Sequence, residues 1–142
     1  AAFYAGCFSE LFEINEPKVK MHPWFSTASG NYVFALNQML IQCKDDQIAI
    51  APAVPENWKD FSYNLPCYGK ILASVAVSDG KLTKMKLTAA NMGEMVDRTL
   101  LIPESLVKKQ MLNKKVVSSV ENNKGILSVH VHFQGQCDMI LN

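Results

Sequence analysis

Two apolar stretches joined by a tight-turn signal constrain this chain more than any other feature of its sequence. From Ile71 to Val77, apolar residues occupy every second position, which is the period of a strand with one buried face. Asp79-Gly80 follows, and an Asp-Gly pair between two such stretches is typical of a two-residue hairpin turn. The returning stretch predicts Thr83, Met85, Leu87 and Ala89 on one face and Leu82, Lys84, Lys86 and Thr88 on the other. The sequence therefore predicts an antiparallel hairpin here.

More strands are expected on either side of this hairpin. Gln47–Ile50 reads as a short strand, and the stretches 96–102, 116–121, 126–133 and 137–141 read as further strands. Short strands separated by turn residues at this spacing are typical of a β-sandwich. The second half of the chain is therefore predicted to be an antiparallel β-sandwich.

The first half has a different character. All aromatic residues except Phe133 lie at or before Tyr68. Tyr4, Cys7, Phe8 and Leu11 fall at helical spacing, and Pro17 marks a point by which that helix has ended. A second helix is predicted over 32–42, with Val33, Leu36 and Leu40 as its apolar stripe and further apolar residues on its other sides.

A helix that is apolar on most sides needs burial among other helices. Two helices cannot supply that burial alone, so we expect neighbours beyond these residues. The chain opens Ala1-Ala2-Phe3-Tyr4, without a Met or a signal-peptide pattern. The expectation is that it was cut from a longer polypeptide.

Charge and cysteine usage exclude several classes of function. The formal net charge is +1, without the concentrated basic face of a nucleic-acid binder. No apolar stretch reaches the roughly 20 residues that span a membrane. Cys7, Cys43, Cys67 and Cys137 are scattered, which argues against a zinc or redox motif. We expect buried thiols, no metal site and no cofactor, although an even cysteine count permits disulfides.

One ordered set of residues resembles a known enzyme family. The set runs His22-Pro23-x-Phe25, Gly30-Asn31, Gln38-Met39-Leu40-Ile41-Gln42 and Ile48-Ala49-Ile50-Ala51-Pro52-Ala53-Val54-Pro55-x-x-Trp58. It is similar to the end of the helical barrel, and the passage into a C-terminal sandwich, of family 95 glycoside hydrolases, the α-L-fucosidase family. The resemblance covers roughly half of the chain. It implies a secreted or periplasmic protein that acts on glycans.

The resemblance also implies where a sugar would bind. Such enzymes place an acid and a base on either side of the scissile glycosidic bond. The family's acid lies upstream of the matched segment, so no catalytic residue is expected in this chain. An Asp that supports water activation precedes the family's Gly-Asn, and Ser29 stands there instead, or Ala28 if the gap is placed differently. Predicted substrate-binding residues are His22, Trp24, Phe25, Ser29 and Asn31. The alternatives are that the aromatic loop wedges against the helices and that Ser29 caps a helix.

His130 and His132 lie two residues apart on a predicted strand, so both point to one face, opposite Val129, Val131 and Phe133. Such a pair can bind zinc, but a catalytic zinc needs a third protein ligand, and the sequence offers no obvious one. We predict an ordinary solvated strand face.

These observations combine into one prediction. The fold class is α+β and mostly β, with two N-terminal helices that end an α/α barrel, followed by an antiparallel β-sandwich. The expected divisions are 1–46 for the end of the helical barrel, 47–60 for a linker and first strand, and 61–142 for the sandwich. The expected function is the non-catalytic, structural C-terminal part of a fucosidase-like glycoside hydrolase, whose partners are an upstream barrel of the same chain and an oligosaccharide. The alternative is a carbohydrate-binding sandwich module. Neither nucleic acid nor a membrane is an expected partner.

Overall fold

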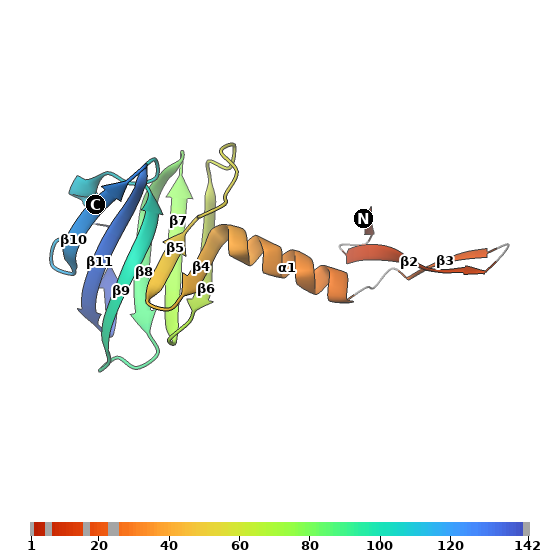
Figure 1. The fold of residues 1–142 in the computed structure, drawn as a ribbon, viewed down its shortest axis with the longest axis horizontal. Helices are drawn as coiled ribbons and strands as arrows, with labels where there is room; N and C mark the ends of the chain where they lie inside the picture. Colours follow the sequence, from red (N-terminus) through yellow and green to blue (C-terminus); the bar gives the residue numbers. More distant parts are fainter. Residues whose placement is uncertain (1, 5–6, 16–17, 23–25, 141–142) are drawn as a thin grey trace. The chain divides into compact units, whose positions relative to one another are not determined.

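The computed structural model describes residues 2–4, 7–15, 18–22 and 26–140. In this part the chain is mostly strand, with one α-helix, as Figure 1 shows. It divides into two compact units, Ala1–Leu36 and Asn37–Asn142. Within the described residues, no helix combines the length and hydropathy needed to cross a membrane.

The first unit contains a small antiparallel sheet. Its strands are β1 (Ala2–Tyr4), β2 (Cys7–Asn15) and β3 (Lys18–His22), with β2 in the middle. Phe3 pairs with Phe8, Ile14 pairs with Val19, and the β2–β3 register shifts once along the hairpin. The helix α1 (Ser26–Leu40) follows and runs across the division between the units.

The predicted first helix is wrong, because the structure places strand β2 over most of it. The stretch Cys7–Asn15 also fits the strand period, with Phe8, Phe12 and Ile14 at alternate positions. Short apolar stretches that fit both periods are ambiguous, and aromatic and β-branched residues favour the strand. The second predicted helix is present, but it begins at Ser26 and ends at Leu40 rather than at Gln42.

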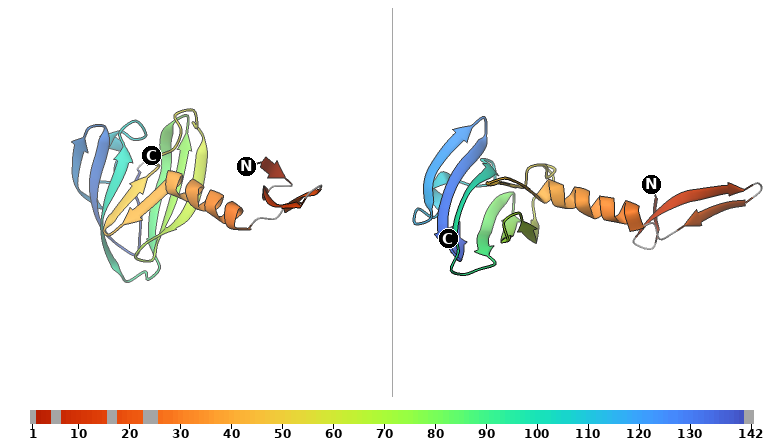
Figure 2. Two further views of the ribbon diagram at one scale, coloured as in Figure 1. Left: turned by 45° about the vertical axis from the view of Figure 1, so that its right-hand side comes forward. Right: turned by 60° about the horizontal axis from the view of Figure 1, so that its bottom comes forward.

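The second unit consists of two facing sheets, seen as two layers in Figure 2. The five-stranded sheet has the order β10 (Val117–Asn123), β11 (Ile126–Gln134), β9 (Met95–Pro103), β5 (Gln47–Ile50) and β4 (Ile41–Lys44). The four-stranded sheet has the order β12 (Gln136–Asp138), β8 (Lys81–Ala89), β7 (Ile71–Ser78) and β6 (Phe61–Cys67). A short 3-10 helix, η1 (Lys109–Met111), precedes β10. The expectation of a mostly β chain is confirmed.

One strand pair departs from the predicted antiparallel arrangement. β5 pairs with β9 in parallel, with Ile48 opposite Leu100. Three strands of the four-stranded sheet, β6, β7 and β8, lie between these two strands in the sequence. A parallel pair needs such a long crossover, because both strands must run in the same direction.

The core lies between the two sheets and follows from the alternation in the sequence. In β7, Ile71, Ala73, Val75 and Val77 are buried, and in β11, Leu127, Val129, Val131 and Phe133 are buried. Fully burying one such Val, Leu, Ile or Phe side chain stabilises the fold by roughly 1.5–3 kcal/mol. Inward-facing residues from both sheets form one continuous apolar cluster.

The hairpin of β7 and β8 is confirmed, with positive φ angles at both Asp79 and Gly80. The predicted faces of β8 are wrong at its start. A register shift inserts Thr83 as an extra residue, since Ala76 pairs with Lys84 and Val77 pairs with Leu82. Leu82 is therefore buried, like Met85, and Thr83 is exposed. A β-bulge re-aims side chains in this way, and alternation alone does not reveal it.

Candidate ligand-binding pocket

Three loops at one end of the sandwich enclose a pocket of about 510 Å³. The first is the connection between β5 and β6, the second is the turn of the β7–β8 hairpin, and the third follows β9. Because β5 and β9 are parallel, the segments that leave them start at the same end of the sheet. The lining residues are Ala51, Val54, Pro55, Glu56, Trp58, Lys59, Phe61, Asp79, Gly80, Lys81, Pro103, Ser105 and Leu106.

Backbone hydrogen bonds hold these loops against one another. The Gly80 N–H donates to the Lys59 carbonyl at 2.8 Å, which ties the hairpin turn to the first loop. The Leu82 N–H donates to the Leu106 carbonyl at 2.8 Å, which ties the same hairpin to the third loop. The Lys81 ammonium also donates to the carbonyl of Ser105. The pocket wall is therefore built by contacts between loops.

Asp60 reinforces the first of these connections. Its Oδ1 accepts hydrogen bonds from the Ser78 hydroxyl at 2.9 Å and from the Asp79 N–H at 3.1 Å. The bond from the Asp79 N–H, helped by the Ser78 hydroxyl, lowers the pKa of Asp60, because both donors favour the carboxylate. Asp60 therefore stays ionised at neutral pH and holds the hairpin turn beside the first loop.

The chemistry of the lining suits an uncharged polar ligand that has an apolar face. Trp58 is 41% exposed, so part of its indole ring is open to a ligand, while Phe61 and Leu106 are half-buried beside the pocket. The charged lining residues are two lysines, Lys59 and Lys81, and two carboxylates, Glu56 and Asp79. Because these charges cancel, the pocket has no net charge that would attract a strongly charged ligand. Pockets with apolar walls and a few polar groups are typical binding sites for small molecules.

Sequence reasoning assigned no binding role to Trp58. A signal was present, because Trp58 lies in a Pro-containing loop between two strands, where binding residues are often found. A partly exposed tryptophan also offers a rigid apolar surface and an N–H donor. The other lining residues come together from segments far apart in the sequence, and no local pattern connects them.

None of the sequence-predicted binding residues is among the residues that line this pocket. Ser29 and Asn31 are within α1, half-buried and exposed respectively. His22 is the last residue of β3, and its backbone pairs with Glu10. Trp24 and Phe25 lie outside the described residues. The sugar-binding role of these five residues stays a prediction, and the capping alternative for Ser29 is wrong because α1 begins three residues earlier.

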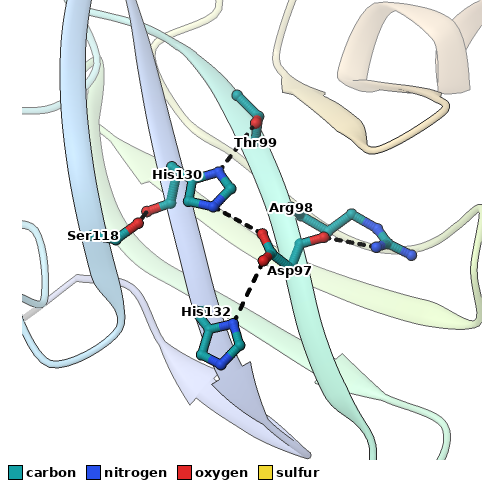
Figure 3. A network of polar contacts seen from close by, with 6 residues as sticks. All are labelled: Asp97, Arg98, Thr99, Ser118, His130 and His132. Atoms are coloured by element: carbon teal, nitrogen blue, oxygen red, sulfur yellow. Dashed lines mark hydrogen bonds and ion pairs between the residues drawn. The ribbon is translucent and has the colours of Figure 1, made fainter.

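A second polar cluster lies on the outer face of the five-stranded sheet (Figure 3). His130 and His132 of β11 flank the Asp97 carboxylate of β9. His130 Nε2 is 2.9 Å from Asp97 Oδ1, and His132 Nδ1 is 3.7 Å from Asp97 Oδ2. All three side chains are at least 42% exposed, so water competes for each contact.

This outer-face cluster has the character of a solvated strand face. The residues on either side of the histidines, Val129, Val131 and Phe133, are buried on the opposite face, as the alternation predicts. Asp97 is a neighbour that the sequence could not place, because the register of β9 against β11 brings it there. Among the residues whose positions are described, no group of three or more His, Cys, Asp or Glu side chains is arranged to hold a metal ion.

No family model, curated protein or solved structure matches this chain. The case for a function therefore depends on the residues themselves. The loop pocket beside Trp58 is the candidate site, because it combines concavity, an accessible aromatic ring and balanced charge.

Proposed function

We propose that this chain is the C-terminal part of a glycan-cleaving enzyme that resembles the α-L-fucosidases of glycoside hydrolase family 95. Its strands form a structural, non-catalytic module, and α1 packs among helices of a barrel that precedes it in the same polypeptide. Secretion or location in the periplasm is part of this proposal. The barrel would carry the catalytic acid.

The apolar surface of α1 is the observation that supports this role. Val33 is 55% exposed and Phe34 is 64% exposed, and Tyr32 beside them is 41% exposed. Consecutive exposed apolar residues lie on different sides of a helix, so a single neighbour cannot cover them all. Packing among several helices would remove this surface from water.

The end of α1 is fastened to the sandwich, which suits a module that supports a helical domain. The Ala51 N–H donates to the Leu40 carbonyl at 2.7 Å, and the Tyr63 hydroxyl donates to the same carbonyl at 2.8 Å. The Ala53 N–H donates to the Met39 carbonyl at 3.2 Å. These bonds satisfy carbonyls that a helix end leaves without partners in the helix. The helix end and the sandwich are therefore expected to move together.

Activity measurements on two preparations test the proposal. The 142-residue chain alone, of 15.8 kDa, is expected to release no nitrophenol from nitrophenyl α-L-fucoside or other nitrophenyl glycosides. The native polypeptide, captured with an antibody against this chain, is expected to be much larger and to hydrolyse at least one of these glycosides. The panel extends beyond fucosides because Ser29 replaces the family's Asp. Hydrolysis by the 142-residue chain, or a native polypeptide of its size, would contradict the proposal.

The pocket beside Trp58 supports a second candidate function, which is binding of a neutral oligosaccharide by the sandwich. Aromatic rings pack against the apolar CH faces of sugars, and polar groups around them bind hydroxyls. Trp58 supplies such a ring, and Glu56 and Lys59 lie with it on the same loop. The near-neutral lining matches an uncharged glycan better than an acidic one.

Isothermal titration of the full chain with neutral plant and host oligosaccharides tests this second function. Trp58→Ala is expected to weaken binding at least about tenfold, a loss of about 1.4 kcal/mol, because the stacking surface is gone. Tyr68→Ala is the matched control, since Tyr68 is 76% exposed and does not line the pocket. The control variant should bind like the unmodified chain. Equal losses in both variants, or no binding by any oligosaccharide, would count against a pocket at Trp58.

A further inference from the structure

Two cysteines lie on edge strands of opposite sheets. Cys43 is in β4, the edge strand of the five-stranded sheet, and Cys67 is the last residue of β6, the edge strand of the four-stranded sheet. β4 and β6 contact each other and lie along the same side of the sandwich, as Figure 1 shows. The two cysteines therefore come from strands that face each other across the open edge of the core.

Both side chains lie on the inward faces of their strands. In β4, Ile41 is buried and Cys43 half-buried, while Gln42 between them is exposed. Cys67 is 8% exposed, and Cys43 is near enough to affect the pKa of its thiol. Each of the cysteines whose side chains are described is a free thiol in this structure.

Cys67 lies on the inward face of β6. Tyr63 and Leu65 lie on the same face of this strand as Cys67. Tyr63 is buried, and its hydroxyl donates a hydrogen bond to the Leu40 carbonyl. Burial, and then contact with Cys43, raises the pKa of the Cys67 thiol, so Cys67 remains protonated at neutral pH. Cys43 is the more accessible thiol of the two. The pair thus combines one reachable sulfur with one protected sulfur beside it.

We propose that Cys43 and Cys67 form a disulfide that joins the two sheets when the protein meets a low-molecular-weight disulfide such as oxidised glutathione. Sequence spacing gives no hint of this pair, because the two cysteines belong to no short motif. The proposal is independent of any glycan-related role, since it rests only on the positions of the two thiols.

The reaction is a thiol–disulfide exchange in two steps. The Cys43 thiolate attacks one glutathione sulfur, forms a mixed disulfide and releases one glutathione thiolate. Cys67 then loses its proton, and its sulfur attacks the Cys43 sulfur, which displaces the second glutathione thiolate. Two protein thiols are oxidised, the glutathione disulfide is reduced to two thiols, and the two protons from the protein end on the glutathione sulfurs. The accessible Cys43 begins the exchange, because access and thiolate character control the rate.

The crosslink would close the loop that includes β5 and the Trp58 loop. Closing a loop of roughly 25 residues lowers the conformational entropy of the unfolded chain and so stabilises the folded state. For a domain of this size, the melting temperature is expected to rise by roughly 10 °C. It would also hold the two edge strands together at the side where the sandwich is open.

Mass spectrometry of the full chain tests the pairing directly. After exposure to oxidised glutathione, the intact mass should fall by about 2 Da relative to the reduced protein, because two hydrogens are lost. Peptide mapping should recover Cys43 joined to Cys67, and the melting temperature should rise. A stable glutathione adduct on Cys43 with Cys67 still reduced would overturn the proposal, as would a different pairing or an unchanged melting temperature.

Serine variants provide matched controls. Cys43→Ser and Cys67→Ser should each abolish the mass loss and the thermal shift, while Cys137→Ser should retain both. Cys137 is also buried, but its thiol contacts the Met139 sulfur at 3.7 Å rather than another cysteine. Burial raises the pKa of Cys137 to about 11, so it should exchange slowly. If a variant fails to fold, differential alkylation of the unmodified chain still decides, since both Cys43 and Cys67 must become protected together.

Discussion

Replacing Gly135 with alanine is expected to destabilise the sandwich by about 2–5 kcal/mol. Gly135 links β11 to β12 with a φ of +65°, which side chains rarely adopt. A Cβ at this position would lie 2.5 Å from the Met92 carbonyl oxygen and 3.1 Å from the Met92 Cα. These are backbone atoms, so a rotamer change cannot relieve the overlap. The estimate adds the left-handed strain of about 1–2 kcal/mol to an overpacking cost of about 1–3 kcal/mol.

Gly125→Ala is the matched control for this variant. Gly125 has a φ of +85°, but a Cβ there would meet nothing within 4 Å. It should therefore lose only the backbone strain of about 1–2 kcal/mol. Urea denaturation of the two variants and the unmodified chain gives both free energies of unfolding. Equal losses would show that the close approach of Gly135 to Met92 has no energetic consequence.

Leu100→Ala is expected to cost about 2–5 kcal/mol, because it opens a cavity in the middle of the core. Leu100 is 0% exposed, and β9 is the central strand of the five-stranded sheet. It lies opposite Val129 on one neighbouring strand and opposite Ile48 on the other, and both of these side chains are also buried. Neighbours held in two strand ladders cannot collapse freely into the space that the leucine leaves.

Leu72→Ala makes the same chemical change on the outer face of the other sheet. Leu72 is 41% exposed, so its truncation removes less buried surface and leaves no enclosed cavity. We expect a loss of about 1 kcal/mol or less. Chemical denaturation of both variants is the measurement. If Leu72→Ala proved as costly as Leu100→Ala, the placement of the core between the two sheets would be wrong.

The strands of the sandwich could be predicted because their signals are local. Ile71, Val75 and Val77 alternate with outward residues, and Asp79-Gly80 marks the turn, so the hairpin needs no knowledge of distant residues. The same alternation placed His130 and His132 on the face opposite Val131, as the structure shows. Period and turn chemistry are properties of a few consecutive residues.

What escaped prediction depends on contacts between distant segments. The parallel pairing of Ile48 with Leu100 joins strands that are separated in the sequence by three strands of the other sheet. The bulge at Thr83 arises from its fit to β7, and Asp97 reaches the histidines only through the β9–β11 register. The Trp58 pocket likewise comes from three loops that meet at one end. The stretch Cys7–Asn15 is a different case, because its apolar residues are compatible with both the helical and the strand period.

The parallel partnership of β5 and β9 has a consequence for how the molecule is made. Gln47 cannot pair with Thr99 until about fifty more residues have been synthesised. Bringing the two residues together then costs the conformational entropy of closing a loop of that length. Until then, the edge of β5 that pairs with β9 has no partner strand. High contact order of this kind slows folding, so maturation should depend on the late arrival of β9 rather than on the early strands.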